Sequence, residues 1–340
     1  MNIYEDSVCS GLVSSQICVD SDGESAWVLV DDGVEYVEEM MAIISCVRGI
    51  IEGIEYRDCK YKKDRLNYFG KAVLSAVKID SKGVIEYFNG NLISPYLRIF
   101  DDARDKLKGD VDLWLSVIYD GFCDVQAYRA VGEFVKCVRE SVDEPDFKKY
   151  MKNNWRARMK SLASVRHFMD SLCGQVSSLQ VVRLKLGYGS KFLHSSGVNY
   201  EVVSVKRDFS RFVKGVSGRY GKESCFGYVW KLGFSSGRYL SYDFFLFLDG
   251  SKFIDGSLVA AELGELWRDI VTMGGGTCLS YNEHANCSKV GLFGVGGERT
   301  LRVQNLYFDL YSLVKLDSLI KPNLIGIGRT FGRSGIRGGF

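Results

Sequence analysis

Two aromatic-rich stretches decide the fold: Phe226-Gly-Tyr-Val-Trp-Lys-Leu-Gly-Phe234 and Tyr242-Asp-Phe-Phe-Leu-Phe-Leu248. Aromatic and β-branched residues are enriched in strands, so each stretch predicts a strand. The polar segment Ser235-Ser236-Gly237-Arg238 follows the first stretch and has the composition of a short hairpin loop. The sequence therefore predicts an antiparallel hairpin over residues 226–248.

The segments around this hairpin extend it into a larger sheet. The segment 179–188 alternates, with Leu184 and Leu186 on one face, which predicts a further strand. Arg183 and Lys185 fall on its other face. Helices are predicted over 202–216 (ending before Ser217-Gly218) and 257–271, and a last strand over 277–281. The order strand, helix, strand, strand, helix, strand is the split βαβ arrangement, an antiparallel sheet with helices on one face.

The N-terminal half is predicted to be helical. Apolar residues recur there at three- and four-residue spacing, the pattern of an amphipathic helix: Val37, Met40, Met41, Ile44, Val47, Ile50, Ile51 and Ile54. Further helices are predicted over 64–78, 98–107, 111–119, 127–141 and 155–176. The polar segment 143–154, which holds Pro145, marks the expected domain boundary. The fold class is therefore α+β, with a helical region over 1–154 and a split βαβ domain over 155–340.

The basic side chains are concentrated in the second half of the chain. The whole chain has 44 basic and 42 acidic residues, and 46% of its residues are hydrophobic, which is typical of a globular protein. Residues 1–50 contain ten acids and one base, whereas residues 181–222 contain nine bases and two acids. Residues 315–340 contain five bases and one acid. We expect a phosphate-binding surface in the second half, the alternative being ordinary solvated faces.

The cysteines and the N-terminus indicate the cellular compartment. None of the ten cysteines forms a C-x-x-C pair, and Glu5 and Asp6 stand where a signal peptide carries basic residues. Arg48 and Glu52 interrupt the apolar stretch from 40 to 54, which is too short to span a bilayer. We therefore expect reduced thiols in a soluble, cytoplasmic protein without a membrane partner.

Six short blocks, strongest over about residues 160–335, resemble a known family. They are Val181-Val-Arg-Leu-Lys-Leu-Gly-Tyr188, Gly227-Tyr-Val-Trp-Lys-Leu232, Phe245-Leu-Phe-Leu-Asp-Gly-Ser-Lys252, Leu263-Gly-Glu-Leu-Trp267, Leu310-Tyr-Ser-Leu-Val-Lys315 and Arg329-Thr-Phe-Gly-Arg-Ser334. In this order they resemble the YagK/YfjJ-type, inovirus-like replication protein family. Toward the N-terminus only the helical character and Ser94-Pro95-Tyr96-Leu97 are similar.

The resemblance implies a rolling-circle initiator of the HUH class, which nicks one DNA strand with a tyrosine. In that class two histidines, two residues apart on a central strand, hold a divalent metal ion. Here the pair falls on Ser241 and Asp243, and the chain's three histidines lie elsewhere. Asp243 is a possible ligand for Mg²⁺ or Mn²⁺. The alternatives are a pair of residues without a metal, or Asp243 paired with a neighbouring base.

The resemblance also implies a nucleophile and DNA contacts. It places the tyrosine about one helical turn before Lys315, at Tyr311, with Tyr307 one turn further back on the same helix face. Packing in the core is the alternative role for both rings. The expected DNA contacts are Arg183, Lys185, Lys315, Arg329, Phe331 and Arg333. The alternative is that Phe331 is a buried anchor and the arginines cap a helix end.

These observations lead to three functional hypotheses. The first is a phage or mobile-element replication-initiator-like protein that binds single-stranded or origin DNA, with its nicking activity weakened or lost. The second is an active HUH-type endonuclease that uses Tyr311 or Tyr307 and a divalent metal. The third is a non-catalytic regulatory or protein-interaction module. Whether the protein is an enzyme is left open, and its expected partners are DNA and replication proteins.

Overall fold

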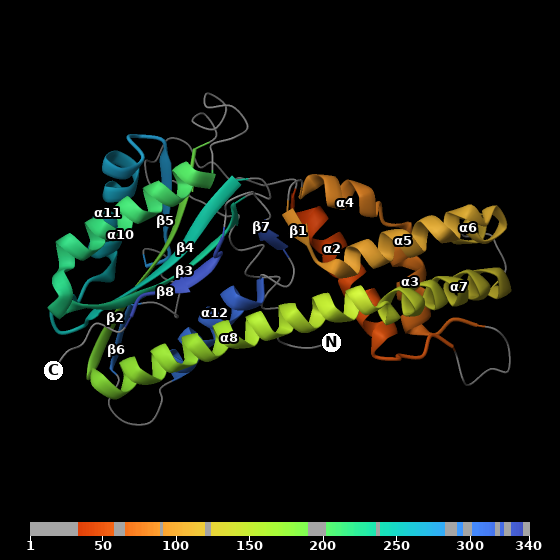
Figure 1. Cartoon of the computed structure of the whole chain (residues 1–340), viewed down its shortest axis with the longest axis horizontal. Coiled ribbons are helices and arrows are strands. Elements are labelled where there is room, and N and C mark those ends of the chain that lie inside the picture. Colours follow the sequence, from red (N-terminus) through yellow and green to blue (C-terminus); the bar gives the residue numbers. More distant parts are fainter. Residues whose placement is uncertain are drawn as a thin grey trace. The chain divides into compact units, whose positions relative to one another are not determined.

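The computed structural model describes residues 33–57, 65–88, 91–119, 124–189, 202–235, 239–282, 291–294, 301–316, 320–322 and 328–335 (Figure 1). A run of helices precedes the main sheet, so the predicted α+β class is confirmed. The chain divides into two compact units, and the division falls between Arg156 and Ala157. The acidic start of the predicted N-terminal region, residues 1–32, lies outside the described residues.

The first unit is built from helices around a core of aliphatic and aromatic side chains. Its elements are α2 (Gly33–Ile51), α3 (Tyr68–Lys78), α4 (Ser81–Tyr87), β1 (Asn91–Ile93), α5 (Pro95–Gly109), α6 (Val111–Ile118), α7 (Asp124–Asp143) and the start of α8 (Pro145–Gln175). Ile320 also belongs to this unit, because β7 (Ile320–Pro322) pairs with β1. The predicted stripe is correct over most of its length, since Met40, Ile44 and Val47 are fully buried.

The segment expected to separate the domains is helical. Helix α8 begins at Pro145 and continues without a break to Gln175. Proline is well accommodated at the first position of a helix, where its missing N–H would have no helical partner. Pro145 therefore starts a helix, whereas the sequence predicted a domain boundary at this segment.

The second unit contains a six-stranded sheet. Its elements after α8 are β2 (Ser178–Tyr188), α10 (Val202–Ser224), β3 (Cys225–Ser235), β4 (Tyr239–Asp249), α11 (Gly256–Glu265), the π-helix η2 (Leu266–Val271), β5 (Gly276–Ser280), β6 (Gly291–Gly294), α12 (Leu301–Leu316) and β8 (Phe331–Arg333). The strand order is β5-β2-β4-β3-β8, and β6 pairs with the start of β2. All these pairs are antiparallel, so the predicted split βαβ core is present, with two strands added to it.

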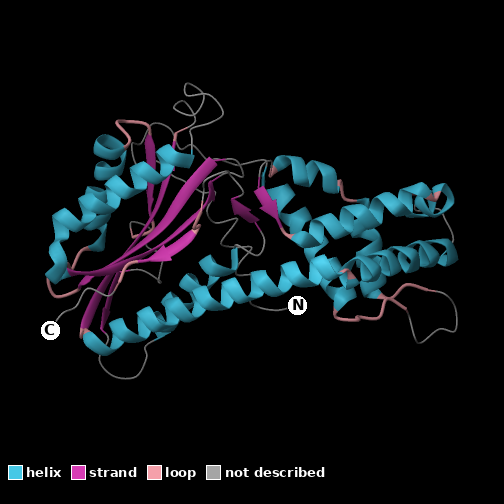
Figure 2. Ribbon diagram, viewed as in Figure 1, coloured by secondary structure: helices cyan, strands magenta, loops and turns pink. Residues whose placement is uncertain are grey.

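Helices cover both faces of this sheet (Figure 2). On one face α10, α11 and η2 pack on even-numbered residues of the central strands, such as Leu184 and Phe244. On the other face α8 and α12 pack on odd-numbered residues, such as Val181 and Phe245. The expectation of helices on one face was therefore incomplete, because the strands are apolar on both faces along half of their length.

Two helix ends differ from the predicted positions. Helix α10 continues past Ser217-Gly218 and is broken at Gly221, whose φ of 65° lies in the left-handed region that glycine tolerates. The predicted helix over 257–271 changes from α to π geometry at Leu266. The Thr272 hydroxyl donates to two carbonyls of this turn, those of Trp267 (2.8 Å) and Arg268 (3.0 Å).

None of the described helices is both long enough and apolar enough to cross a lipid bilayer.

Candidate nucleic-acid interface

Ser241 and Asp243 lie on the central strand β4, on the sheet face that α8 and α12 cover. Side chains alternate along a strand, so both residues share a face with Phe245, which packs in the α8–α12 core. In the register of the sheet Lys185 of β2 and Lys231 of β3 stand opposite Asp243, one on each side. Both lysines are buried. The strand position implied by the resemblance therefore carries one acid between two bases.

Arg183 forms an ion pair with the carboxylate of Asp243. Its Nη2 lies 3.7 Å from Asp243 Oδ1, and its Nη1 lies 3.5 Å from Asp309 Oδ2 on α12. The guanidinium also lies over the ring of Tyr281, with Cζ 4.1 Å from the ring centroid. Asp243 is thus paired with a neighbouring base, which was one of the alternatives drawn from the sequence. Arg183, expected as a DNA contact, is held within the protein.

Ser241 lies on the same face of β4, opposite a glycine of β3. Its hydroxyl is buried and has no hydrogen-bond partner among the described residues. The residue opposite it on β3 is Gly233, and no described heavy atom lies within 4 Å of where a Cβ of Gly233 would stand.

These residues do not fit a divalent cation. Mg²⁺ prefers several oxygen ligands, and the described part of the chain contains no group of three or more metal-binding side chains. The carboxylate of Asp243 would have to exchange its guanidinium partner for the metal, and Ser241 offers only a hydroxyl.

Tyr307 and Tyr311 lie on the side of α12 opposite Asp309. Each is two residues from Asp309 along the helix, which corresponds to a rotation of about 200°. The Tyr307 hydroxyl donates to Asp170 Oδ1 on α8 at 2.5 Å, and the Tyr307 and Tyr311 rings meet edge to face. Both rings pack on the α8–α12 core. Asp309 reaches the Asp243 cluster through Arg183, whereas Tyr307 is directed toward α8.

The expected contacts near the C-terminus are mostly internal. Arg333 Nε donates to Ser164 on α8 at 2.8 Å, and its guanidinium lies over the Phe168 ring. Phe331 is half-buried and packs against the core formed by α8 and α12. Lys315 is half-buried, and Arg329 is exposed. Of the six DNA contacts expected from the sequence, Arg329 alone is exposed to solvent.

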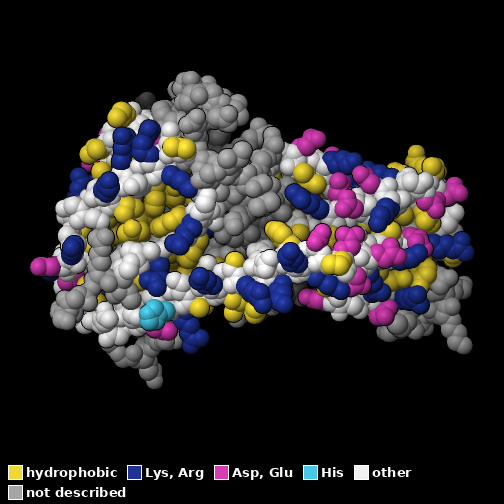
Figure 3. Space-filling view, viewed as in Figure 1, with side chains coloured by type: hydrophobic (Ala, Val, Ile, Leu, Met, Phe, Trp, Pro, Cys, Tyr) yellow, Lys and Arg dark blue, Asp and Glu magenta, His cyan; other side chains and the backbone are white. Residues whose placement is uncertain are grey.

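Five exposed cations of the second unit lie on α10. Arg207, Arg211 and Lys214 are exposed and follow the helical spacing i, i+4, i+7, so they form one row, which we call the basic stripe. Arg219 and Lys222 follow it along the helix and are also exposed. In Figure 3 several dark-blue side chains lie in the region where Figure 1 draws α10, among white and yellow atoms.

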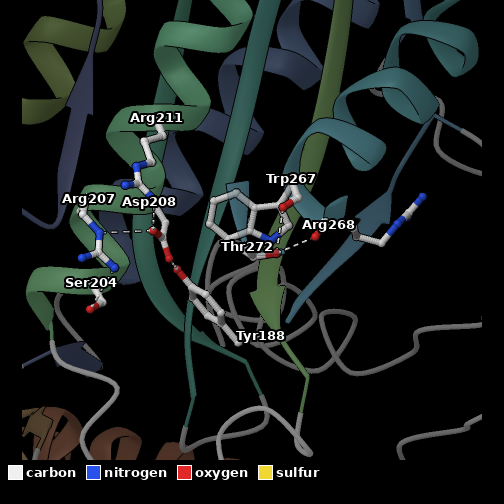
Figure 4. A network of polar contacts seen from close by, with 8 residues as sticks. All are labelled: Tyr188, Ser204, Arg207, Asp208, Arg211, Trp267, Arg268 and Thr272. Carbon is white, nitrogen blue, oxygen red and sulfur yellow. Dashed lines mark hydrogen bonds and ion pairs between the residues drawn. The ribbon is translucent and has the colours of Figure 1, made fainter. Parts of the chain in front are cut away.

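A buried carboxylate orients the two arginines of the stripe (Figure 4). Asp208 is 2% exposed, and its Oδ1 lies 3.7 Å from Arg207 Nε and 3.9 Å from Arg211 Nη1. The Tyr188 hydroxyl donates to the other oxygen of Asp208 at 3.3 Å. About half of each arginine side chain stays exposed, 55% and 52%. The arginines therefore lie beside a buried carboxylate and present their remaining N–H groups to solvent.

The sequence contained the signal for this stripe. Residues 181–222 contain nine bases, but the contacts expected among them were only Arg183 and Lys185 on the strand. The spacing of positions 207, 211 and 214 within a predicted helix identifies a single basic face. Burial explains the difference, because a charge on a strand face that is covered by helices does not reach solvent.

Comparison with known proteins gives no relative for this chain: no family model, no curated protein and no solved structure matches it. The resemblance to replication proteins therefore remains an expectation from the sequence.

Proposed function

We propose that this protein is a replication-initiator-like protein that binds single-stranded or origin DNA and has weakened or no nicking activity. The observation that carries the proposal is the arginine pair of the basic stripe, Arg207 and Arg211, oriented by the buried Asp208. Guanidinium groups bind phosphate oxygens through paired, charge-assisted hydrogen bonds. Each guanidinium lies near the carboxylate of Asp208 and stays about half exposed, so its outward N–H groups are accessible to phosphate oxygens.

The spacing of the stripe suits a phosphate backbone. Four residues of helix separate Arg207 from Arg211, a rise of about 6 Å. This is comparable to the distance between successive phosphates along an extended strand. Lys214 adds a third charge one turn further on, and the stripe holds no exposed aromatic side chain. We infer that the stripe recognises charge and backbone spacing, without reading bases.

The loss of nicking is inferred from the sheet face. An HUH enzyme requires a metal opposite a tyrosine, whereas Asp243 is paired with Arg183 and Tyr307 with Asp170. Each group would have to leave a charged or hydrogen-bonded partner before it could act. From these two pairings we infer that the protein binds DNA without cleaving the strand.

Binding is tested with a labelled 30-nucleotide single strand and its duplex, by fluorescence polarisation across a series of salt concentrations. We expect the double variant Arg207→Ala/Arg211→Ala to reduce the slope of log K against log salt by about 2 units. The matched control is Lys252→Ala/Arg268→Ala, which removes two exposed charges from the same unit and keeps the stripe. Unchanged binding by the stripe variant, or an equal loss in the control, would rule out the stripe.

A second variant avoids effects on folding. Removing both arginines leaves Asp208 buried without its cations, so Lys214→Ala/Lys222→Ala tests the surface away from that carboxylate. We expect it to bind more weakly than the wild type with an unchanged melting temperature. Nicking is tested with the same strand and Mg²⁺ or Mn²⁺ on a denaturing gel. We expect no covalent protein–DNA adduct, and an adduct would favour the active endonuclease.

A further inference from the structure

The first half of α8 is exposed on all but one side, where Phe147, Met151, Asn154 and Arg158 are half-buried. From Pro145 to Lys160 none of its residues is buried. Lys149, Lys152 and Arg156 are exposed there, and Trp155 keeps 55% of its surface accessible. Figure 3 shows dark-blue side chains gathered along the middle of α8. A tryptophan this exposed among cations is not explained by packing of the core.

These four residues form one face of the helix. Lys149, Lys152 and Arg156 follow the spacing i, i+3, i+7, so they lie along one row about 10 Å long. Trp155 lies three residues after Lys152 and beside Arg156, on the same side. We call this face the α8 patch. No ion-pair partner of its three cations is found among the described residues.

The patch differs from the basic stripe in its chemistry. On α10 the one exposed large apolar side chain among the described residues is Val203, which offers no ring for stacking. The α8 patch combines a row of cations with the face of an indole ring. Cations bind the backbone of any nucleic acid, whereas an exposed ring stacks on bases that are not already stacked in a duplex.

We propose that the α8 patch is a binding site for single-stranded DNA, with Trp155 stacked on an unpaired base and Lys149, Lys152 and Arg156 on adjacent phosphates. This inference rests on the proposed DNA-binding function and assigns the selectivity for single strands to a second surface. The basic stripe supplies a contact to any phosphate backbone, and the α8 patch distinguishes an open strand from a paired one.

The test uses the full chain with a 15-nucleotide oligothymidine and with a 15-base-pair duplex. We expect Trp155→Ala to weaken oligothymidine binding about thirtyfold, the middle of the range for loss of one base–aromatic stack, and to leave duplex binding nearly unchanged. Trp155→Phe keeps a ring and should restore part of the affinity. Tryptophan fluorescence should fall on addition of oligothymidine in the wild type, and this change should be reduced in Trp155→Ala.

The charges are tested with Lys149→Ala/Lys152→Ala/Arg156→Ala. The matched control is Lys71→Ala/Arg129→Ala/Lys136→Ala, which removes three exposed charges from other helices of the same unit. We expect the patch variant to lower the salt slope for oligothymidine by about 2 units, at about 0.7 per phosphate, and the control to change it little. All substituted side chains are exposed, so circular dichroism should show unchanged folding.

The outcomes separate this inference from the proposed function. If stripe variants lose DNA and patch variants bind oligothymidine like the wild type, the α8 patch is wrong and the proposed function stands. Equal losses on single strand and duplex would overturn the assignment of selectivity to Trp155. If the wild type binds neither DNA, both proposals fail.

Discussion

The guanidinium of Arg183 lies 3.7 Å from the carboxylate of Asp243, across the two adjacent strands β2 and β4. The same guanidinium lies 3.5 Å from Asp309 on α12, so one cation serves two acids. These side chains are 19%, 14% and 8% exposed, which makes the cluster a largely buried ionic network between sheet and helix. The network links α12 to the sheet at the position where the resemblance implies a metal ion.

We predict that Arg183→Met destabilises the protein by roughly 2–4 kcal/mol, because it removes the cation that two largely buried carboxylates share. Asp243→Asn should cost less, about 1 kcal/mol, because Asp309 remains as the partner of Arg183. Urea denaturation of the wild type, both single variants and the double variant measures the coupling between Arg183 and Asp243. A coupling near zero would contradict the ion pair.

The fold was largely predictable because its strands are unusually apolar and aromatic. The hairpin of 226–248 and the strand at 179–188 are present, and the pairing Lys231 with Asp243 follows from that hairpin. The short strands β6 and β8 were missed, since four or three residues do not show a period. The packing of α8 and α12 on the second face of the sheet was not predicted either, because it depends on tertiary contacts between segments far apart in the sequence.

The candidate site was predicted less well, because burial does not follow from residue type. Asp243 was identified at its strand position, with pairing to a base as an alternative. Arg333 was expected to face DNA, yet its partner Ser164 lies 169 residues earlier in the sequence. The exposure of Trp155 could not be predicted from the sequence either, since a Trp at a helix boundary is usually assigned to the core.

We predict that Tyr307→Phe lowers the free energy of unfolding by about 1–2 kcal/mol, because the Tyr307 hydroxyl donates to the carboxylate of Asp170. Tyr311→Phe is the control. The hydroxyl of Tyr311 has no hydrogen bond among the described residues, so its loss should change stability little. Thermal and urea denaturation measure the free energy of unfolding of both variants. Neither change should alter DNA binding, and loss of a DNA adduct in either variant would restore that tyrosine as the nucleophile.

We predict that Gly332→Ala destabilises the edge of the sheet. A Cβ at Gly332 would lie 2.7 Å from atoms of the Trp230 indole, closer than real contacts allow. Overpacking of this kind costs about 1–3 kcal/mol. Gly335→Ala is the matched control, since no described atom lies within 4 Å of the Cβ it would add. Equal stability of the two variants in urea would mean that β8 moves away from Trp230 without cost.

A final prediction concerns the turn after β4 and its dependence on pH. The Ser251 hydroxyl donates to Asp249 Oδ1 at 2.6 Å, and this bond, with the Ser251 backbone N–H, lowers the pKa of the Asp249 carboxyl. Because the pKa is lower in the folded than in the unfolded chain, the stabilisation is present above the unfolded pKa of about 3.9. It is lost as the pH falls through the folded pKa.

Ser251→Ala should therefore destabilise the protein by about 0.5–1 kcal/mol at pH 6, an ordinary value for an exposed hydrogen bond to a charged group. Its difference from the wild type should shrink as the pH is lowered to about 3, where protonation of Asp249 weakens the bond in the wild type as well. Ser257→Ala is the control, because the Ser257 hydroxyl donates to the backbone carbonyl of Asn282 at 3.3 Å. A carbonyl does not titrate, so the effect of Ser257→Ala should be the same at both pH values. A Ser251→Ala effect that is equally independent of pH would mean that the hydroxyl stabilises the turn without acting on the Asp249 charge.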